Sequence, residues 1–553
     1  MKRLMFLLLV GLLSLALTQC APKATPSPVP PPTEPPPTEA PPTEAPTAVP
    51  PTPTEVPPTE EVQAQPKILR VAATASVTTW DPSASFSTEA LYMANIYEPL
   101  MWINPDGTFE PALAESWEVS EDGLMWAFNV REGVTFHDGE SLTADAVVKS
   151  IQRTIDLGTG AAWIWWMVDT IEAVDDMTVE ITLTTPYPLD RVAASTYAAW
   201  IMSPAAAAQD SEWFETGQEA GTGPWMLESY TPDEEIVLTR FEDYWGGWED
   251  DQFDKVVISI VPEQVVQAQM LEGGEVDLAL SLPVETLEGF RANTDFVVYE
   301  DATLFNYVGF MNVKKPPLDD QLVRQAIAYA IPYDDVVEVG TGGLGQQARG
   351  PVPHGLWPYS DEVFQYTYDP AKAKELLTEA GYPEGGFSLV LTHAAENLNE
   401  ERFAPVIKDA LADLGIEVEV RPMLWAQQWE MAKGDPTEAQ DMFLLLWWPT
   451  ISDGYDNLSS MFKCEEKPFF SLAYYCNEEY DNLINEALNL TATDPEKAQE
   501  MYTEAMNILA EDSPSLFLYD TSVFRPVPTY LKGYEYNANY PFSTFFYPIR
   551  TTQ

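Results

Sequence analysis

Cysteine and histidine are scarce in this 553-residue chain, with three of each. His137, His354 and His393 are far apart in the sequence and form no cluster of the kind that holds zinc. Basic residues are also few: 28 lysines and arginines stand against 87 acidic residues, a formal net charge of −59. Because phosphate binding needs the opposite sign, we expect no nucleic-acid partner. We interpret the acidic excess as a solvated surface; attraction of cationic ligands is the alternative.

Recognisable catalytic motifs are missing. The sequence contains no Gly-x-Ser-x-Gly elbow, Walker loop, His-Glu-x-x-His pair or dinucleotide fingerprint. Paired carboxylates carry no information in so acidic a chain and do not argue for a glycosidase. We therefore expect no enzyme, no catalytic residue, no metal and no cofactor, and a secreted hydrolase is the remaining enzymatic alternative.

Long apolar runs are confined to the first twenty residues. Two basic residues precede an apolar stretch from Leu4 to Leu17, which is too short for a membrane span and has the form of a secretory signal. Cys20 follows shortly after the stretch, and residues 1–20 resemble a bacterial lipoprotein signal with its lipobox, in which this cysteine is lipidated. Gln19 is not the small residue usual before such a cysteine, so an ordinary cleaved signal is the alternative.

Residues 21–66 have almost nothing apolar to bury. They hold 18 of the 48 prolines and repeat the phrase Pro-Pro-Thr-Glu. Such a stretch stays extended and disordered, so we expect a stalk between a lipid anchor and a globular body. Two acyl chains on one cysteine are enough for a firm anchor.

The other two cysteines, Cys464 and Cys476, are twelve positions apart in an aromatic stretch. In an oxidising compartment two neighbouring cysteines most often pair, so we predict a disulfide. A metal site is the alternative, but two cysteines without a histidine partner make a poor zinc site.

From residue 67 onward, predicted strands and helices alternate. We expect an opening strand at 68–72, a hairpin with an Asp-Gly turn at 122–123, and a helix over 144–154. Well-punctuated helices at 370–380 and 402–414 are each followed by a strand, which indicates an α/β unit with parallel strands.

Several phrases follow one another in order through this body. They are Ile-Tyr-Glu-Pro-Leu at 96–100, Pro-Ala-Leu-Ala-Glu-Ser-Trp at 111–117, Val-Arg-Glu-Gly-Val-Thr-Phe-His-Asp-Gly at 130–139, Gly-Thr-Gly-Pro-Trp at 221–225, Gly-Glu-Val-Asp-Leu-Ala at 274–279 and Val-Arg-Gln-Ala-Ile-Ala-Tyr-Ala-Ile at 323–331. Their order and spacing resemble the family 5 extracellular solute-binding proteins of ABC importers, the peptide/nickel group. Taken physically, the Gly-Thr-Gly-Pro phrase predicts a hinge or a strand entry where no side chain would fit.

The resemblance implies an α/β fold: the two-lobed, type II-like periplasmic-binding-protein fold with an additional third domain (cluster C type). Domain I would combine residues 67–99, 222–302 and 521–553. Domain II would be residues 100–221, and domain III residues 303–520. The ligand would lie between domains I and III, which close over it by a hinge motion.

The resemblance also implies a role. We expect a monomeric receptor at the cell surface or in the periplasm, held to the membrane by its lipid. It would capture an oligopeptide and deliver it to the permease and ATPase complex of an ABC importer. The same fold and role with an oligosaccharide or another small solute is the alternative.

In peptide-binding members of the family, an Asp shortly before a disulfide cysteine holds the α-ammonium of the ligand. Counting back from Cys464, Asp453 has the matching position, with Asp456 as the nearby alternative. A buried carboxylate facing an ammonium is a charge-assisted pair that water does not easily replace. Turn capping is the competing interpretation, since Ser-Asp-Gly is also good turn chemistry.

Dipeptide binders of the family hold the ligand carboxylate with an Arg in the stretch after the strand that corresponds to residues 389–391. Here residues 392–397 contain no Arg, and the first one is Arg402. The difference favours a longer peptide, whose carboxylate need not be held.

Tryptophans supply the other expected part of the site. We expect Trp425, Trp447, Trp448, Trp165 and Trp166 to line a cleft, because small-ligand pockets have apolar walls. Stacking on sugar rings is the alternative use of these side chains. Core packing is the default for any single Trp, but three of them in the four positions 163–166 do not all face one core.

Overall fold

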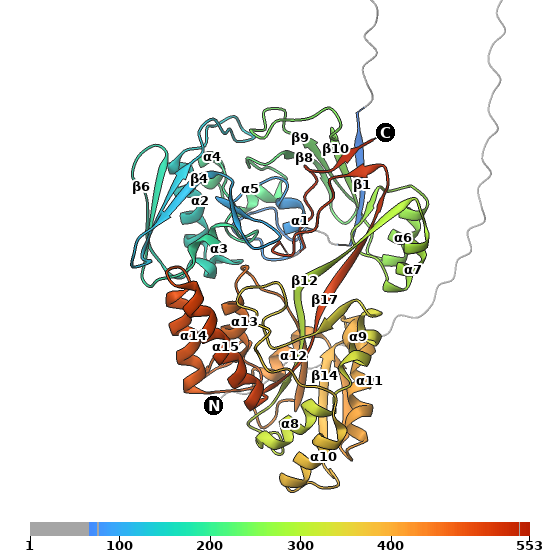
Figure 1. Ribbon diagram of the computed structural model, residues 1–553. Helices are drawn as coiled ribbons and strands as arrows, with labels where there is room; N and C mark the ends of the chain where they lie inside the picture. Colours follow the sequence, from blue (N-terminus) through green and yellow to red (C-terminus); the bar gives the residue numbers. More distant parts are fainter. Residues whose placement is uncertain (1–65, 75–76, 541, 553) are drawn as a thin grey trace, which may run out of the picture. The chain divides into compact units, whose positions relative to one another are not determined.

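Three large sheets organise the folded part of the chain (Figure 1). The computed structural model describes residues 66–74, 77–540 and 542–552, which belong to one compact unit. The expected signal, the lipidated Cys20 and stalk residues 21–65 lie outside the described residues. Among the helices that are described, none is long and apolar enough to cross a membrane.

The first sheet has five strands in the order β11-β1-β10-β9-β8. Strand β1 (Ile68–Ala73) is parallel to β10 (Lys255–Ile260) and to β11 (Leu278–Ala279). Strands β9 (Glu235–Arg240) and β8 (Trp225–Thr231) continue the sheet antiparallel. The strand predicted at 68–72 is confirmed, and its partners β10 and β11 come from much later in the sequence.

Two glycines let the chain pass close to another segment before β8. A Cβ on Gly221 would overlap the carbonyl oxygen of Ile96, and a Cβ on Gly223 would lie 2.7 Å from the carbonyl oxygen of Asn95. The predicted strand entry without room for a side chain is thus confirmed.

The second sheet is antiparallel, in the order β4-β5-β7-β6, with helix α2 packed on it. Its hairpin turns at Gly123, whose φ of +68° suits glycine, as the Asp-Gly pair predicts. Helix α2 begins after Thr143, whose side chain accepts a hydrogen bond from the N–H of Ala146, and ends at Gly158 with φ +60°. The bounds are β4 Ala114–Val119, β5 Met125–Val130, β6 Val168–Ala173, β7 Thr178–Leu183 and α2 Ala144–Leu157.

The third sheet has six strands, in the order β13-β17-β12-β16-β14-β15. The predicted α/β unit is confirmed, because β14 is parallel to both β15 and β16. Helix α11 begins at Leu398, four residues before the predicted start, because the side chain of Asn397 caps its first turn. The bounds are β12 Phe296–Met311, β13 Gly345–Gln347, β14 Ser388–Ala394, β15 Glu417–Met423, β16 Met442–Trp447, β17 Ser515–Pro528, α8 Gln321–Ala330, α9 Tyr333–Thr341, α10 Pro370–Glu379 and α11 Leu398–Ala412.

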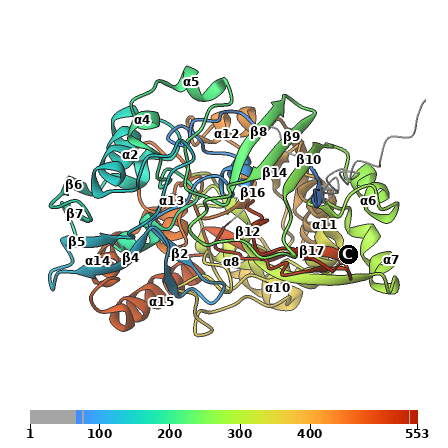
Figure 2. The same cartoon turned by 90° about the horizontal axis from the view of Figure 1, so that it is seen from above.

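The long strands β12 and β17 pair along most of their length and reach from the third sheet to the first (Figures 1 and 2). At that end β17 contacts β11, and β12 contacts α7. The two strands are therefore the central connection between these sheets. The remaining elements are α1 Ala90–Met93, β2 Met101–Ile103, β3 Phe109–Pro111, η1 Ala162–Trp165, α3 Leu189–Ala193, α4 Pro204–Ala207, α5 Ser211–Glu215, α6 Gln264–Glu272, η2 Val284–Thr286, α7 Leu287–Ala292, α12 Trp425–Ala432, α13 Gly454–Phe462, α14 Glu478–Leu490, α15 Pro495–Asp512, β18 Leu531–Lys532 and β19 Arg550–Thr551.

Candidate ligand-binding site

A cavity of about 320 Å³ lies beside the middle of β12 and β17. One part of its lining comes from residues 280–285, which follow β11 of the first sheet. The other part comes from the third sheet and its helices, with Tyr307 on β12, Leu446 on β16 and Leu398 on α11. Its volume is at the lower end of the range for small-ligand sites, and its wall draws on two sheets.

An ion pair joins the two parts of this lining. Nη2 of Arg402 on α11 lies 2.5 Å from Oε1 of Glu285 on η2, and both side chains are partly exposed. Arg525 of β17 also lines the cavity, but it is buried and donates a hydrogen bond to the carbonyl oxygen of Ala279. The cavity therefore offers one accessible cation and one accessible anion.

Trp448, one of the expected site residues, lies at the aromatic edge of this cavity. Its ring packs against Phe305 and Phe542, with ring centroids 6.3 and 5.7 Å away. Phe305 also lines the cavity itself. Trp448 is 37 % exposed and is thus available to a ligand.

Trp447 and Trp425 contact a different cluster. Trp447 is buried and meets Phe470 edge-on at 5.1 Å, while Trp425 stacks on Trp429 at 6.1 Å. Consecutive residues of a strand point to opposite faces, so Trp447 is on the face of the third sheet that Trp448 does not share. The structure therefore does not bring Trp425 and Trp447 together with Trp448.

The tryptophans of η1 are divided between core and surface, as their spacing predicts. Trp165 is buried, and its Nε1–H donates to the carbonyl oxygen of Ala198 at 2.8 Å. Trp166 is 55 % exposed and touches the edge of Tyr187. Neither residue lines the cavity beside β12.

Asp453 is 1 % exposed and precedes α13 as its N-cap. Its Oδ1 accepts a hydrogen bond from the N–H of Tyr455, and its Oδ2 lies 3.0 Å from Nε of Arg191. Burial raises the pKa of this carboxyl to about 6, with the charge of Arg191 acting against the rise. Capping and ion pairing are therefore established for Asp453, and ammonium binding stays a prediction.

Asp456 is also buried and is held within its own turn. Its Oδ2 accepts from the N–H of Thr450 at 2.9 Å, and its Oδ1 accepts from the hydroxyl of Ser460 at 3.0 Å. Burial raises the pKa of this carboxyl to about 6 as well. The disulfide between Cys464 and Cys476 is present and follows α13.

No site role was expected from the sequence for four residues that matter here: Phe305, Phe542, Arg402 and Arg191. For Arg402 a signal exists, because it is one helical turn after Leu398, and both line the cavity. The other three are brought in from distant parts of the chain.

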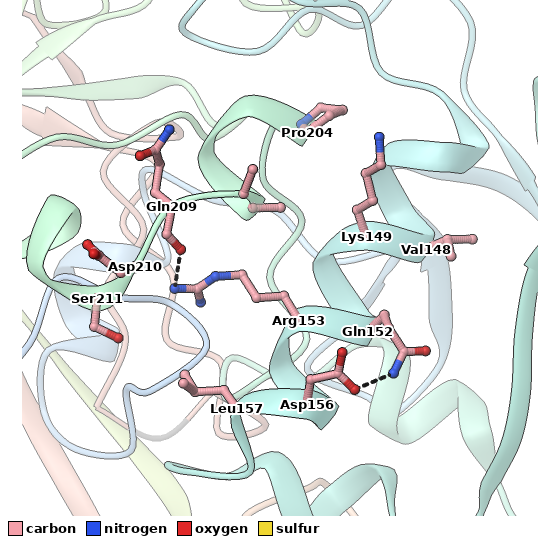
Figure 3. Close-up of a pocket in the computed structure, with 12 residues that line it drawn as sticks. Val148, Lys149, Gln152, Arg153, Asp156, Leu157, Pro204, Gln209, Asp210 and Ser211 are labelled. Carbon is pink, nitrogen blue, oxygen red and sulfur yellow. Dashed lines mark hydrogen bonds between the residues drawn. The ribbon is translucent and has the colours of Figure 1, made fainter.

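A second hollow, of about 750 Å³, lies between α2 and the segment around α4. Figure 3 shows Arg153 pointing across it toward Gln209, whose carbonyl oxygen accepts a hydrogen bond from it at 3.3 Å. Its two cations have partners within the protein: Arg153 pairs with Asp81 and Lys149 with Asp145. The charges in this hollow are paired within the protein, and both of its walls come from residues 148–211. It therefore suits a ligand less well than the cavity beside β12 and β17.

The comparisons with known proteins agree with this architecture. Residues 108–469 match the model of the bacterial extracellular solute-binding proteins, family 5. The chain is 32 % identical to the heme-binding protein A of Haemophilus influenzae, over 79 % of this chain and 84 % of that protein. It is 30 % identical to the dipeptide-binding protein of Escherichia coli, over 77 % and 84 %.

A solved structure shares the fold over nearly the whole described part. The periplasmic binding protein DppA of Helicobacter pylori, in complex with the peptide STSA, superposes with a TM-score of 0.72 at 26 % identity and covers 88 % of this chain and 98 % of its own. The predicted family and the periplasmic-binding-protein fold are thus confirmed. The chain belongs to family 5 of the bacterial extracellular solute-binding proteins, the substrate-binding proteins of ABC importers.

Proposed function

We propose that this chain is a lipid-anchored, monomeric receptor that captures an oligopeptide in the cavity beside β12 and β17. It would then present the peptide to the permease and ATPase of an ABC importer. The observation that carries the proposal is the composite lining, which combines residues 280–285 with Tyr307 and Leu446 of another sheet. A ligand held between two such walls can be enclosed and released by a hinge motion along β12 and β17.

The proposed domains follow the sheets. Domain I, from residues 67–99, 222–302 and 521–553, would contain the five-stranded sheet. Domain II, residues 100–221, would contain the four-stranded sheet. Domain III, residues 303–520, would contain most of the six-stranded sheet, whose strands β12 and β17 continue into domain I. In this division the cavity draws on domains I and III.

Two relatives support a peptide ligand, since one is named a dipeptide-binding protein and another was solved with the peptide STSA. The Arg402–Glu285 pair in the cavity lining adds a chemical reason. The carboxylate of a peptide can pair with Arg402 in place of Glu285. A non-peptide solute is the second candidate, because the 32 % identical relative is named for heme.

We keep Asp453 as the proposed anchor for the ligand ammonium, with Asp456 as the alternative; both lie outside the lining of the cavity beside β12 and β17. Within the described part of the chain, Oδ2 of Asp453 accepts no hydrogen bond and has only the ionic contact with Arg191. A ligand ammonium could supply that hydrogen bond. Arg191 would then serve as the counter-ion of Asp453 when the ligand is absent.

The test is calorimetric titration of the purified protein with short peptides, a glucose tetrasaccharide and hemin. The proposal expects peptide binding that Asp453→Asn weakens by tenfold or more, while Asp145→Asn, which alters an exposed carboxylate, has no effect. Binding of the saccharide or hemin without peptide binding would refute the peptide ligand. Peptide binding that survives Asp453→Asn would refute only the anchor.

Family 5 binding proteins are extracellular or periplasmic, and we propose that this chain is anchored there through Cys20. The protein is then expected in the membrane fraction of its host. A Cys20→Ser variant should be released into the soluble fraction, and its retention with the membrane would contradict the anchor.

A further inference from the structure

The wall of the cavity continues into an aromatic surface formed by neighbouring strands. In the register between β12 and β16, Tyr307 is opposite Leu446, and Asn306 is opposite Trp447. Side chains alternate along each strand, so Phe305 and Tyr307 share a face with Leu446 and Trp448. Three of these four residues line the cavity, and Trp448 extends the same face beyond it.

Phe542, from the C-terminal segment, completes this surface. Its ring lies 5.2 Å from that of Phe305 and 5.7 Å from that of Trp448. Trp448 and Phe542 are 37 % and 36 % exposed, in contrast to the buried aromatic residues of the cores. The three rings pack on one another and are still partly exposed. A further aromatic ring can therefore stack on their faces or contact their edges.

The backbone of Phe542 is held in a conformation that suits glycine. Its φ is +65°, a region that a bulky side chain rarely adopts. The ring is still more than a third exposed, so part of its apolar surface is left for a ligand to bury. Backbone strain of this kind collects at ligand sites, where a bound molecule can supply the missing contact.

We propose that Phe305, Trp448 and Phe542 form a subsite that selects peptides carrying an aromatic side chain. The proposal rests on the proposed peptide-binding function and adds a preference to it. The adjoining lining includes several apolar side chains, with Leu344, Leu398 and Val523 among them. Such side chains suit an aromatic ring.

The test compares tetra-alanine with four tetrapeptides in which a single phenylalanine replaces alanine at each position in turn. Calorimetry on the purified protein should find at least one of these peptides binding about tenfold tighter than tetra-alanine, as expected for burial of a phenyl ring. Trp448→Ala should reduce this preference to less than threefold. Trp163→Ala, which removes a similarly exposed tryptophan from η1, should preserve the preference.

A second variant separates the role of the ring from the stability of the fold. Phe542→Gly relieves the positive φ, so its melting temperature should equal or exceed that of the parent protein while the aromatic preference falls. If tetra-alanine binds and no phenylalanine peptide binds more tightly, the subsite is overturned and the peptide receptor stands. Equal effects of Trp448→Ala and Trp163→Ala would also overturn the subsite. If no peptide binds at all, the proposed function fails, and the subsite with it.

Discussion

Nε of Arg191 lies 3.0 Å from Oδ2 of Asp453, and this buried contact joins α3 to the start of α13. Nη1 of the same arginine donates a hydrogen bond to the carbonyl oxygen of Ser452 at 2.8 Å. The guanidinium also lies over the ring of Trp357, 5.1 Å from its centroid. One arginine thus holds the segment that carries the proposed ammonium anchor.

Removing Arg191 should destabilise the protein strongly, because Asp453 would be left as a buried and unpaired carboxylate. We expect Arg191→Ala to lower the free energy of unfolding in urea by about 3–5 kcal/mol. Lys149→Ala is the matched control: it breaks the exposed pair with Asp145 and should cost less than about 0.5 kcal/mol. Equal losses in the two variants would show that the Arg191–Asp453 contact adds nothing to stability.

Local patterns were enough to predict much of the fold and little of the site. The helix predicted at 402–414 and the strand after it are confirmed. Both are predictable from local sequence, because a glycine marks the end of the helix and side chains of alternating polarity mark the strand. Arg191 and Asp453, in contrast, are 262 positions apart, and no local rule relates them. Phe305, Trp448 and Phe542 likewise come from three separate segments whose meeting depends on the whole topology.

The tryptophan pair at 447 and 448 marks the limit of composition as a guide. Both were expected in the cleft because of their residue type. The period of a strand sends neighbouring side chains to opposite faces, so only one of them can border a cavity on a given face. The strand period alone predicts that only one of the two tryptophans borders the cavity. Which of them does so depends on how the sheets pack.

Glu400 should make the protein less stable as the pH rises, whereas a paired surface carboxylate has the opposite effect. Burial raises the pKa of this carboxyl from 4.5 to about 8, although it accepts a hydrogen bond from the N–H of Ala394. The folded protein then binds this proton more tightly than the unfolded chain. The stabilisation is complete below pH 4.5 and is lost as the pH rises through 8, by up to about 1.4 kcal/mol per pH unit.

Glu400→Gln removes this titration. We expect the variant to be more stable than the parent protein at pH 8, by about 1–3 kcal/mol, and close to it at pH 5. The measurement is the free energy of unfolding in urea at both pH values. Glu401→Gln alters the exposed neighbour and should change neither value, and a Glu400→Gln variant that is less stable at pH 8 would contradict the assignment.

The disulfide between Cys464 and Cys476 closes a loop of twelve residues between α13 and α14. Cross-linking so short a loop stabilises by roughly 3 kcal/mol, because it restricts the unfolded chain. The double variant with Cys464→Ser and Cys476→Ser should therefore have a free energy of unfolding in urea that is lower by that amount. A reducing agent should lower the stability of the parent protein and leave the double variant unchanged, and equal sensitivity of the two would exclude a contribution from the bond.

His137 should stay protonated to a higher pH than an ordinary histidine. Its Nδ1 lies 2.7 Å from Oε2 of Glu219 and its Nε2 lies 2.8 Å from the carbonyl oxygen of Gly223, so both ring nitrogens face acceptors. Burial alone would lower its pKa, but the charge of Glu219 and these hydrogen bonds, with a smaller effect from Glu98, outweigh burial and raise it above 6.5. The ring of Phe241 packs against the imidazole edge-on.

Since the folded pKa is raised, the stabilisation by His137 is complete below pH 6.5 and is lost as the pH rises through the folded value. His137→Gln should therefore cost more stability at pH 6 than at pH 9, whereas His354→Gln, at an exposed position, should cost little at either. Nitrogen-15 spectra of the three histidines at pH 6.5 give a direct reading, because an imidazolium has two protonated nitrogens. A neutral ring at position 137, or an equal loss at both pH values, would mean that Glu219 does not hold the charge on this side chain.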